Sequence, residues 1–291
     1  MANYNEQSYT ISCSTTTPGH IIFLIDGGAS MLTYYNGETT RISFVERCIN
    51  EIIFDILGEC IGGLWIRNKV FVSVYQYTVN GVKLLLDSDI VSLVAKYKNE
   101  LNDWYKDKSP AFIKDIEVSS YGGGRLSETL NIVADYMELW KLAIKNGDRF
   151  IRSIGGGNFE KKYGEFREPC KAPLIINMTK GFASLDNEED VLFEVEKLRK
   201  YLFHDGSPLL YNVLMPLYDD RVCLNVTEDF VDLRWKLLWD ISSDFPIYWK
   251  ERWHINIEKR CLLNPRNSKE IFDLFVKPWM YPYRTSNPYS Y

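Results

Sequence analysis

Blocks of apolar residues with two different spacings alternate along this chain. His20–Asp26 is apolar at every position from Ile21 to Ile25, which predicts a strand that is buried on both faces. Residues 42–61 instead carry apolar residues three and four positions apart, which predicts a helix with one buried face. The two patterns recur, and they predict strands at 69–77, 81–88, 112–120, 172–181 and 207–217 and helices within 89–108, 121–146 and 188–203.

This alternation predicts an α/β domain with a central, mostly parallel sheet and helices on both faces, because parallel neighbours need crossover connections. The short turn before residue 82 makes 81–88 an antiparallel edge strand. We expect four parts: an N-terminal arm at 1–17, the α/β domain at 18–246, an exposed insertion within it at 147–171, and an aromatic C-terminal extension at 247–291.

Three polar or glycine-rich segments each follow a predicted strand. They are 26–31 (DGGASM), 121–130 (YGGGRLSETL) and 179–186 (TKGFASLD). In an open α/β sheet, ligands bind beyond the carboxyl ends of the strands, so we expect these segments to be neighbours in space. The crevice between them is the candidate site of the chain.

In this order the three segments resemble the metal-ion-dependent adhesion site of the von Willebrand factor type A (vWA) domain family. That site combines an Asp-x-Ser-x-Ser turn, a threonine in a glycine-rich loop and an aspartate in a Thr-Asp-Gly turn. The resemblance covers about residues 18–246, and LLWDISSDFP at 237–246 is similar to the closing segment of intracellular bacterial members. It implies a Rossmann-like vWA fold and a site where hydroxyl and carboxylate oxygens hold Mg²⁺.

The first two segments match the family pattern only in part. Asp26 matches the first aspartate and Ser30 the second serine, while Gly28 stands where the first serine belongs. Gly124 stands at the threonine position, or Arg125 if the loop is shorter by one residue. Neither residue replaces the missing hydroxyl ligand.

The third segment keeps Thr179 but has Lys180 in place of the family's aspartate. At ~4 Å and an effective dielectric of about 20, an ammonium repels a divalent cation by roughly 8 kcal/mol. We therefore expect a degenerate site without Mg²⁺ or another cofactor, in which the Lys180 ammonium pairs with Asp26; a weakly retained metal site is the alternative. Changing Lys180→Asp is expected to restore part of the divalent-ion affinity.

Composition narrows the classes of partner. With 34 basic and 39 acidic residues the formal net charge is −5, so no global positive field favours nucleic acid or anionic membranes. The apolar runs are far shorter than the ~20 residues of a membrane-spanning helix, and the N-terminus lacks the pattern of a secretory signal. The six cysteines are scattered, which is typical of reduced thiols. We expect a cytoplasmic protein.

The crevice also allows a second interpretation, a nucleotide- or phosphate-dependent enzyme or sensor that uses Asp26, the loop 122–125 and Lys180. A glycine loop that opens a helix can cradle a phosphate, and Arg125 would attract the anion. Asp26 could also act as the phospho-transfer aspartate of a haloacid dehalogenase-like hydrolase, although Gly28 replaces the second acid. The loop lacks the spacing of phosphate-binding motifs, and none of the three histidines lies in a nucleophile elbow. An enzyme is therefore the less favoured interpretation.

The favoured interpretation is a non-catalytic adaptor or scaffold that binds other proteins. Its contact surface is expected at the strand-end loops, the insertion 147–171 or the extension 247–291, whose aromatic residues and arginine often dominate interface energies. The extension could equally fold back on its own domain, and both alternatives stay open here. By resemblance, intracellular members serve multi-protein bacterial systems, including tellurite resistance and phage defence. An ATPase, kinase or phosphatase of the same system is then the expected partner.

Overall fold

The computed structural model describes twelve stretches of the chain. They are residues 9–35, 37, 39–62, 65–97, 111–114, 116–145, 150–152, 159–161, 171–181, 186–215, 233–253 and 261–283.

A six-stranded sheet forms the centre of the structure, with the strand order β12-β11-β10-β1-β6-β7. Neighbouring strands are parallel except β6 and β7, which form an antiparallel hairpin at one edge. Strands β1, β10 and β11 are buried at every position, as strands covered on both faces must be. The bounds are β1 (Gly19–Asp26), β6 (Val70–Thr78), β7 (Gly81–Asp89), β10 (Leu174–Thr179), β11 (Leu209–Leu214) and β12 (Cys261–Leu263).

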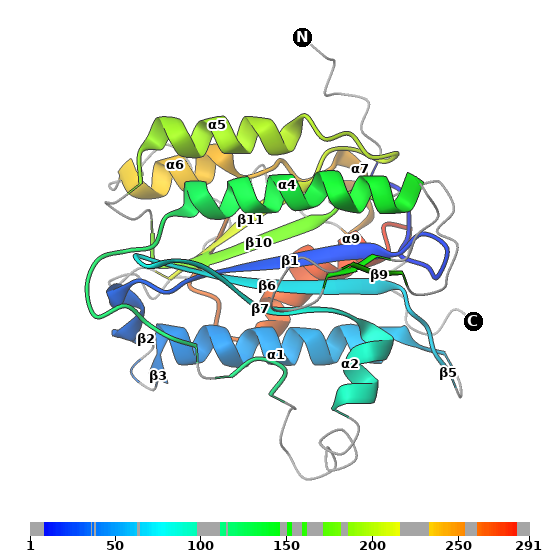
Figure 1. The fold of residues 1–291 in the computed structure, drawn as a ribbon, viewed down its shortest axis with the longest axis horizontal. Coiled ribbons are helices and arrows are strands. Elements are labelled where there is room, and N and C mark those ends of the chain that lie inside the picture. The colour runs from blue at the N-terminus through cyan, green and yellow to red at the C-terminus, as the bar shows by residue number, and fades with distance from the viewer. Residues whose placement is uncertain are drawn as a thin grey trace.

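Helices cover both faces of this sheet (Figure 1). One face carries α1 (Arg41–Cys60) and α2 (Ile90–Lys96); α8 (Ser268–Ile271) lies against α1 and is followed by η4 (Phe272–Val276) and α9 (Lys277–Met280). The other face carries α4 (Leu126–Lys145), α5 (Glu188–Arg199), α6 (Leu233–Ile241) and α7 (Ile247–Arg252). The predicted fold class, a mostly parallel α/β sheet with one antiparallel edge strand between two helical layers, is confirmed.

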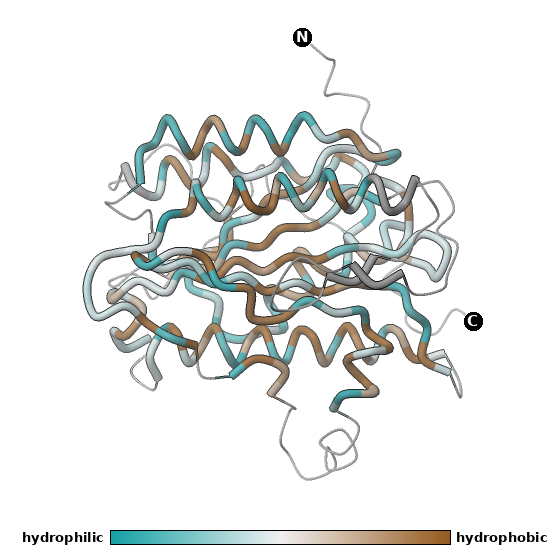
Figure 2. The backbone as a smooth tube through the Cα atoms, in the orientation of Figure 1, coloured by the Kyte–Doolittle hydropathy of each residue, from teal (hydrophilic) through white to brown (hydrophobic). Residues whose placement is uncertain are grey.

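Helix α1 illustrates how the apolar spacing becomes a packed element. Its N-terminus is capped by the Thr40 side chain, which accepts a hydrogen bond from the Ser43 backbone. Ile49, Ile52 and Ile56, which lie three and four positions apart, are fully buried. In Figure 2, which colours the chain by residue hydropathy, hydrophobic residues are concentrated in the strands of the central sheet. None of the helices in the described stretches has the length and apolarity needed to cross a bilayer.

Short elements complete the described chain. They are η2 (Ala29–Leu32), β2 (Tyr34–Tyr35), β3 (Thr39–Thr40), β4 (Ile61–Gly62), β5 (Trp65–Ile66), β8 (Phe150–Arg152) and β9 (Phe159–Lys161). The strands pair as three small antiparallel hairpins: β2 with β3, β4 with β5, and β8 with β9.

The strand predicted at 112–120 is wrong: the described residues of this segment form no strand. Side chains bind its backbone instead of a neighbouring strand. The Asn50 amide both donates to the Ile113 carbonyl and accepts from the Ile113 N–H, each at 2.9 Å. The Gln76 amide donates to the Glu117 carbonyl. The helix predicted within 89–108 begins as α2, and residues 98–108 lie outside the described stretches.

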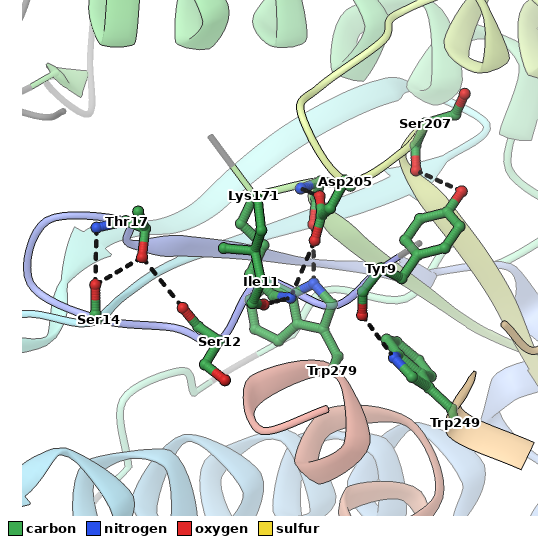
Figure 3. A network of polar contacts seen from close by, with 11 residues as sticks. Tyr9, Ile11, Ser12, Ser14, Thr17, Lys171, Asp205, Ser207, Trp249 and Trp279 are labelled. Atoms are coloured by element: carbon green, nitrogen blue, oxygen red, sulfur yellow. Dashed lines mark hydrogen bonds and ion pairs between the residues drawn. The ribbon is translucent and has the colours of Figure 1, made fainter. Parts of the chain in front are cut away.

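The N-terminal arm, as far as residues 9–17 describe it, is fastened to residues that precede β10 and β11 (Figure 3). Tyr9 donates its backbone N–H to the Asp205 carbonyl at 2.9 Å. The Lys171 ammonium donates to the Ile11 carbonyl at 2.5 Å and lies 3.5 Å from the Asp205 carboxylate. Both charged side chains are almost completely buried, so this contact is part of the core.

The described residues of the aromatic C-terminal segment, 247–253 and 261–283, fold back onto the α/β domain. Strand β12 joins the sheet beside β11. The Trp249 and Trp279 side chains are fully buried, and their indole N–H groups donate to the carbonyls of Tyr9 and Ala172. Within 147–171, the described residues are the hairpin of β8 and β9 and the buried Lys171; residues 147–149, 153–158 and 162–170 lie outside the described stretches.

Candidate functional site

The strand order reverses at β1, and we call the end of the sheet where β1 and β10 finish the crevice end. From β1 the chain crosses to β6 on one side, and it later returns to β10 on the other side. In open α/β sheets, ligands bind at the carboxyl ends of strands beside such a reversal. Asp26 is the last residue of β1 and Thr179 the last residue of β10, so both lie at this point.

Asp26 is sealed at the base of the crevice and is only 3% exposed. Its Oδ1 accepts the Gly28 backbone N–H at 2.8 Å, and its Oδ2 accepts the Thr179 hydroxyl at 2.7 Å. Burial raises the pKa of the Asp26 carboxyl. The hydrogen bonds from Thr179 and Gly28 and the nearby positive charge of Lys180 lower this pKa, but the effect of burial is larger. The carboxylate therefore serves as an internal hydrogen-bond acceptor.

The glycine-rich loop packs its backbone directly on the turn after β1. The Ala29 N–H donates to the Gly122 carbonyl at 3.0 Å, and the Ser119 N–H donates to the Gly27 carbonyl at 2.8 Å. A Cβ on Gly28 would lie 2.9 Å from the Gly123 Cα, so a side chain here requires the backbone to move. The space in which the resembled site has a serine ligand is filled by the facing loop.

Gly124 is restricted for a similar reason. A Cβ at this position would lie 2.5 Å from the Tyr77 carbonyl oxygen. The Tyr77 backbone carbonyl also accepts the Gly27 N–H at 2.8 Å. Glycine at 27, 28 and 124 allows the backbone of the turn after β1, the glycine-rich loop and the end of β6 to approach one another closely. This close approach accounts for the glycines, so no phosphate ligand is needed to explain them.

Asp186 binds the N-terminus of α4 and is a residue that the sequence analysis missed. Its carboxylate accepts the backbone N–H groups of Leu126 and Ser127 and the Ser127 hydroxyl. The first amides of α4, which a phosphate would need, are therefore bound to a side chain of the same protein. Little in the sequence points to this role, because an acid just before 188–203 is more naturally assigned to the start of that helix.

A buried polar row runs from the crevice across the sheet, and the sequence analysis missed it as well. The Tyr77 hydroxyl donates to Asn177 at 2.8 Å, the Asn177 amide donates to Asn212 at 2.7 Å, and Asn212 donates to the Ser242 hydroxyl at 2.8 Å. Asn177 and Asn212 are paired residues on β10 and β11. An asparagine in the middle of each apolar strand was the available signal.

The remaining predicted residues lie around the mouth of the crevice. Arg125 is exposed at the start of α4, Ser30 is half-buried in η2, and Lys180 is half-buried beside Thr179. Lys180 acts on Asp26 through its charge, and the direct pairing of their side chains stays a prediction. Asp26, Gly28, Gly124 and Thr179 form the base of the site.

The donor set does not fit Mg²⁺. Both Asp26 oxygens already accept hydrogen bonds, the position of Gly28 has no room for a ligand side chain, and Lys180 adds positive charge. Within the described stretches, no group of three or more His, Cys, Asp or Glu side chains is arranged to hold a metal ion. A divalent ion prefers several open oxygen ligands, and among the described residues of the three loops Asp26 is the one carboxylate, already bonded to Thr179 and Gly28, that faces Gly28.

His20 lies far from this chemistry and is a core residue. It is fully buried, and its Nε2 lies 2.8 Å from the Ser73 hydroxyl, which in turn donates to Asp87. Burial lowers the pKa of His20 to about 3, so its imidazole is neutral at physiological pH. His254 lies outside the described residues.

No protein-family model and no curated protein matches the chain. Several solved structures are similar in fold. Proximal thread matrix protein 1 from the mussel byssus aligns over 89% of this chain and 46% of its own, with 15% identity and a TM-score of 0.41. A von Willebrand factor type A structure from Catenulispora acidiphila aligns over 74% of this chain and 42% of its own, with 9% identity and a TM-score of 0.40.

The SpRpn10 VWA domain aligns over 88% of this chain and 94% of its own, with 9% identity and a TM-score of 0.42. This chain spans less than half the length of the first two structures. Identities and scores in this range give no basis for transferring an activity.

Proposed function

We propose that this chain is a non-catalytic protein-binding module that uses the loops at the crevice end of its sheet. The observation that carries this proposal is a contrast between the base and the mouth of the crevice. Asp26 is 3% exposed and each of its carboxylate oxygens accepts a hydrogen bond, whereas Tyr34 in β2 and Tyr121 in the glycine-rich loop are 72% and 67% exposed. An acid that is closed off from solvent and bonded to its own chain does not contact a substrate, and exposed aromatic side chains are suited to an interface.

The mouth of the crevice is also preorganised for binding. The buried Arg41 side chain donates to the carbonyls of Met215 at 2.7 Å, Tyr34 at 2.9 Å and Thr33 at 3.2 Å. This arginine ties the loop before α1 to the end of β11. A loop held in one conformation loses less entropy on association, which favours binding.

The cellular setting belongs to the same proposal and rests on the sequence resemblance. We place the protein in the cytoplasm, in a multi-protein bacterial stress or phage-defence system, with an ATPase, kinase or phosphatase of that system as the partner. Arg125, which is exposed at the start of α4 and follows the loop of Tyr121, is suited to an acidic patch on that partner.

Site-specific photo-crosslinking in the native host tests the surface. A photoreactive phenylalanine analogue is introduced at Tyr34, at Tyr121 or, as a control, at Phe193, which is 68% exposed and lies within helix α5, outside the three loops. We expect Tyr34 and Tyr121 to give the same crosslinked protein, and Phe193 not to give it.

The captured protein is then purified and its affinity is measured for the wild type, Tyr121→Ala and Phe193→Ala. We expect at least about a fivefold loss for Tyr121→Ala, since a tyrosine at an interface hot spot contributes more than about 1 kcal/mol, and no change for Phe193→Ala. Equal crosslinking at all three positions, or unchanged affinity of Tyr121→Ala, rejects the crevice-end surface.

A further inference from the structure

A small hairpin at the other end of the sheet exposes apolar side chains to solvent. It consists of β4 and β5 and follows α1 directly. Trp65 is 77% exposed and Ile61 is 58% exposed, and Ile66 also lies at the surface. Such side chains are costly in water when they lie together, so this tip is a candidate contact surface.

Both faces of the hairpin carry apolar side chains. Ile61 pairs with Ile66, and Gly62 pairs with Trp65. Residues directly opposite each other in an antiparallel pair project to the same face, so the two isoleucines share one face and Trp65 lies on the other. A flat protein surface would cover the isoleucines or Trp65, because they lie on opposite faces. The apolar interior of a lipid layer would cover both faces at once.

A positive charge accompanies the apolar tip. A Cβ on Gly62 would lie 2.5 Å from the Arg67 Nε, so the guanidinium group rests over this glycine on the hairpin. Arg67 is exposed. A tryptophan beside an arginine is the combination that favours the boundary between lipid headgroups and acyl chains.

The base of the hairpin is fixed to the folded domain. The Arg67 N–H donates to the Cys60 carbonyl at 2.8 Å. The Glu59 carbonyl accepts both the Lys69 ammonium at 3.2 Å and the Tyr281 hydroxyl at 3.0 Å. The strands β4 and β5 are therefore held in place at the ends that join the folded domain.

We infer that the hairpin of β4 and β5 inserts shallowly into the interface of an anionic lipid bilayer. Trp65 and the two isoleucines enter the boundary of the acyl chains, and Arg67 contacts the acidic headgroups. The net charge of −5 opposes this attraction over long distances, so the contact depends on the apolar tip and its local charge. For this surface we therefore propose a membrane partner, where the sequence predicted none.

The two ends of the molecule can act at the same time. Helix α1 runs from the loop at the crevice to the hairpin, and its 20 residues span about 30 Å. A lipid surface at the hairpin leaves the crevice end accessible, as Figure 1 shows from the positions of β2 and β5. The lipid contact does not depend on the proposed protein-binding surface.

Vesicle flotation of the full chain tests the inference. The probes are vesicles of phosphatidylcholine alone and vesicles of phosphatidylcholine mixed with phosphatidylglycerol. The variants are Trp65→Ser, Trp65→Phe and Arg67→Gln, with Phe193→Ser as the control for loss of an exposed aromatic residue elsewhere.

We expect the wild type and Phe193→Ser to float with the anionic vesicles. Trp65→Ser should bind at least about tenfold more weakly because its apolar area is lost, and Trp65→Phe should retain most of the binding. Arg67→Gln should bind about fivefold more weakly to the anionic vesicles, with less dependence on salt. Failure of the wild type to bind either vesicle, or equal binding of Trp65→Ser and Phe193→Ser, overturns the inference.

Light scattering separates lipid contact from self-association. A wild-type dimer that becomes a monomer in Trp65→Ser, without vesicle binding, would assign the hairpin to a contact between copies of this chain and would reject the lipid surface. We expect the same oligomeric state for both proteins.

Discussion

The Thr179 hydroxyl donates a 2.7 Å hydrogen bond to the Asp26 carboxylate, across the point where the strand order of the sheet reverses. The same hydroxyl oxygen accepts the Gly181 N–H at 3.0 Å, which extends the contact into the next loop. One hydroxyl therefore links the ends of β1 and β10 and solvates a buried charge. The stability of this contact can be tested directly.

Changing Thr179→Val removes the hydroxyl and keeps the side-chain shape. We expect the free energy of unfolding to fall by about 1.5–3 kcal/mol, because a buried carboxylate loses a charge-assisted hydrogen bond. Urea unfolding at neutral pH measures the change. Thr179→Ser is the matched control and should retain most of the stability; an equal loss in both variants would assign the effect to packing of the methyl group.

Changing Asp26→Asn should alter how stability depends on pH. Burial raises the pKa of Asp26 above its ordinary value of 3.8, so between these two pKa values the folded protein keeps a proton that the unfolded chain has released. Stability from this group therefore falls as pH rises through that window. The Asn variant does not titrate, so we expect it to gain stability relative to the wild type as pH rises from acid to neutral.

Urea unfolding of both proteins over that pH range gives the difference directly. Asp55 and Asp205 also have raised pKa values, but they are present in both proteins and cancel in the comparison. A difference that stays constant with pH would show that Asp26 does not titrate differently in the folded state.

Most of the fold follows from the spacing of apolar residues, because buried strands and amphipathic helices are local patterns. The strand 20–26 and the helix 42–61 correspond to β1 and α1 almost residue for residue. The segment 112–120 has the composition of a strand, but its described residues do not form one, since their backbone binds Asn50 and Gln76. Those partners are distant in sequence, and no local pattern reports them.

The candidate site was predictable in position but not in content. Asp26 and Thr179 could be placed together because both end predicted parallel strands. The sequence does not show what fills the space that a side chain at position 28 would take, because that space is filled by the backbone of Gly123, which is distant in the chain. The role of Asp186 could not be predicted either, because its partners on α4 lie about 60 residues away in the chain.

Lys180→Asp tests whether charge or space prevents metal binding. Sequence alone predicts that reversing this charge restores some divalent-ion affinity. The packing of Gly123 against Gly28 leads us to expect no saturable Mg²⁺ or Mn²⁺ binding by calorimetry, because ligand oxygens are still missing. Measurable binding by Lys180→Asp alone would show that repulsion was the main obstacle.

The double change Lys180→Asp with Gly28→Ser makes this test stricter. It adds both a carboxylate and a hydroxyl, yet the serine Cβ would lie 2.9 Å from the Gly123 Cα. We expect a loss of about 1–3 kcal/mol in stability and still no metal affinity. Gly58→Ala is the control for glycine replacement, because a Cβ there meets no neighbour within 4 Å.

Lys171→Met should destabilise the protein strongly because it leaves the Asp205 carboxylate buried without its cation. The two side chains are 0% and 1% exposed, and their charged atoms lie 3.5 Å apart. Removing one partner of a buried pair commonly costs about 3–5 kcal/mol. The change also removes the donor to the Ile11 carbonyl, so the N-terminal arm should loosen.

Urea unfolding measures the first effect, and hydrogen exchange at the Tyr9 and Cys13 amides, which donate to Asp205 and Met280, measures the second. Lys236→Met is the matched control: its pair with Asp240 is exposed and should contribute less than about 0.5 kcal/mol. Adding Asp205→Asn to Lys171→Met should recover part of the loss, because the amide oxygen can still accept the Ala172 N–H. If the double variant is as unstable as Lys171→Met, the loss comes from the lysine's own packing and its bond to Ile11, and the buried charge of Asp205 is not its cause.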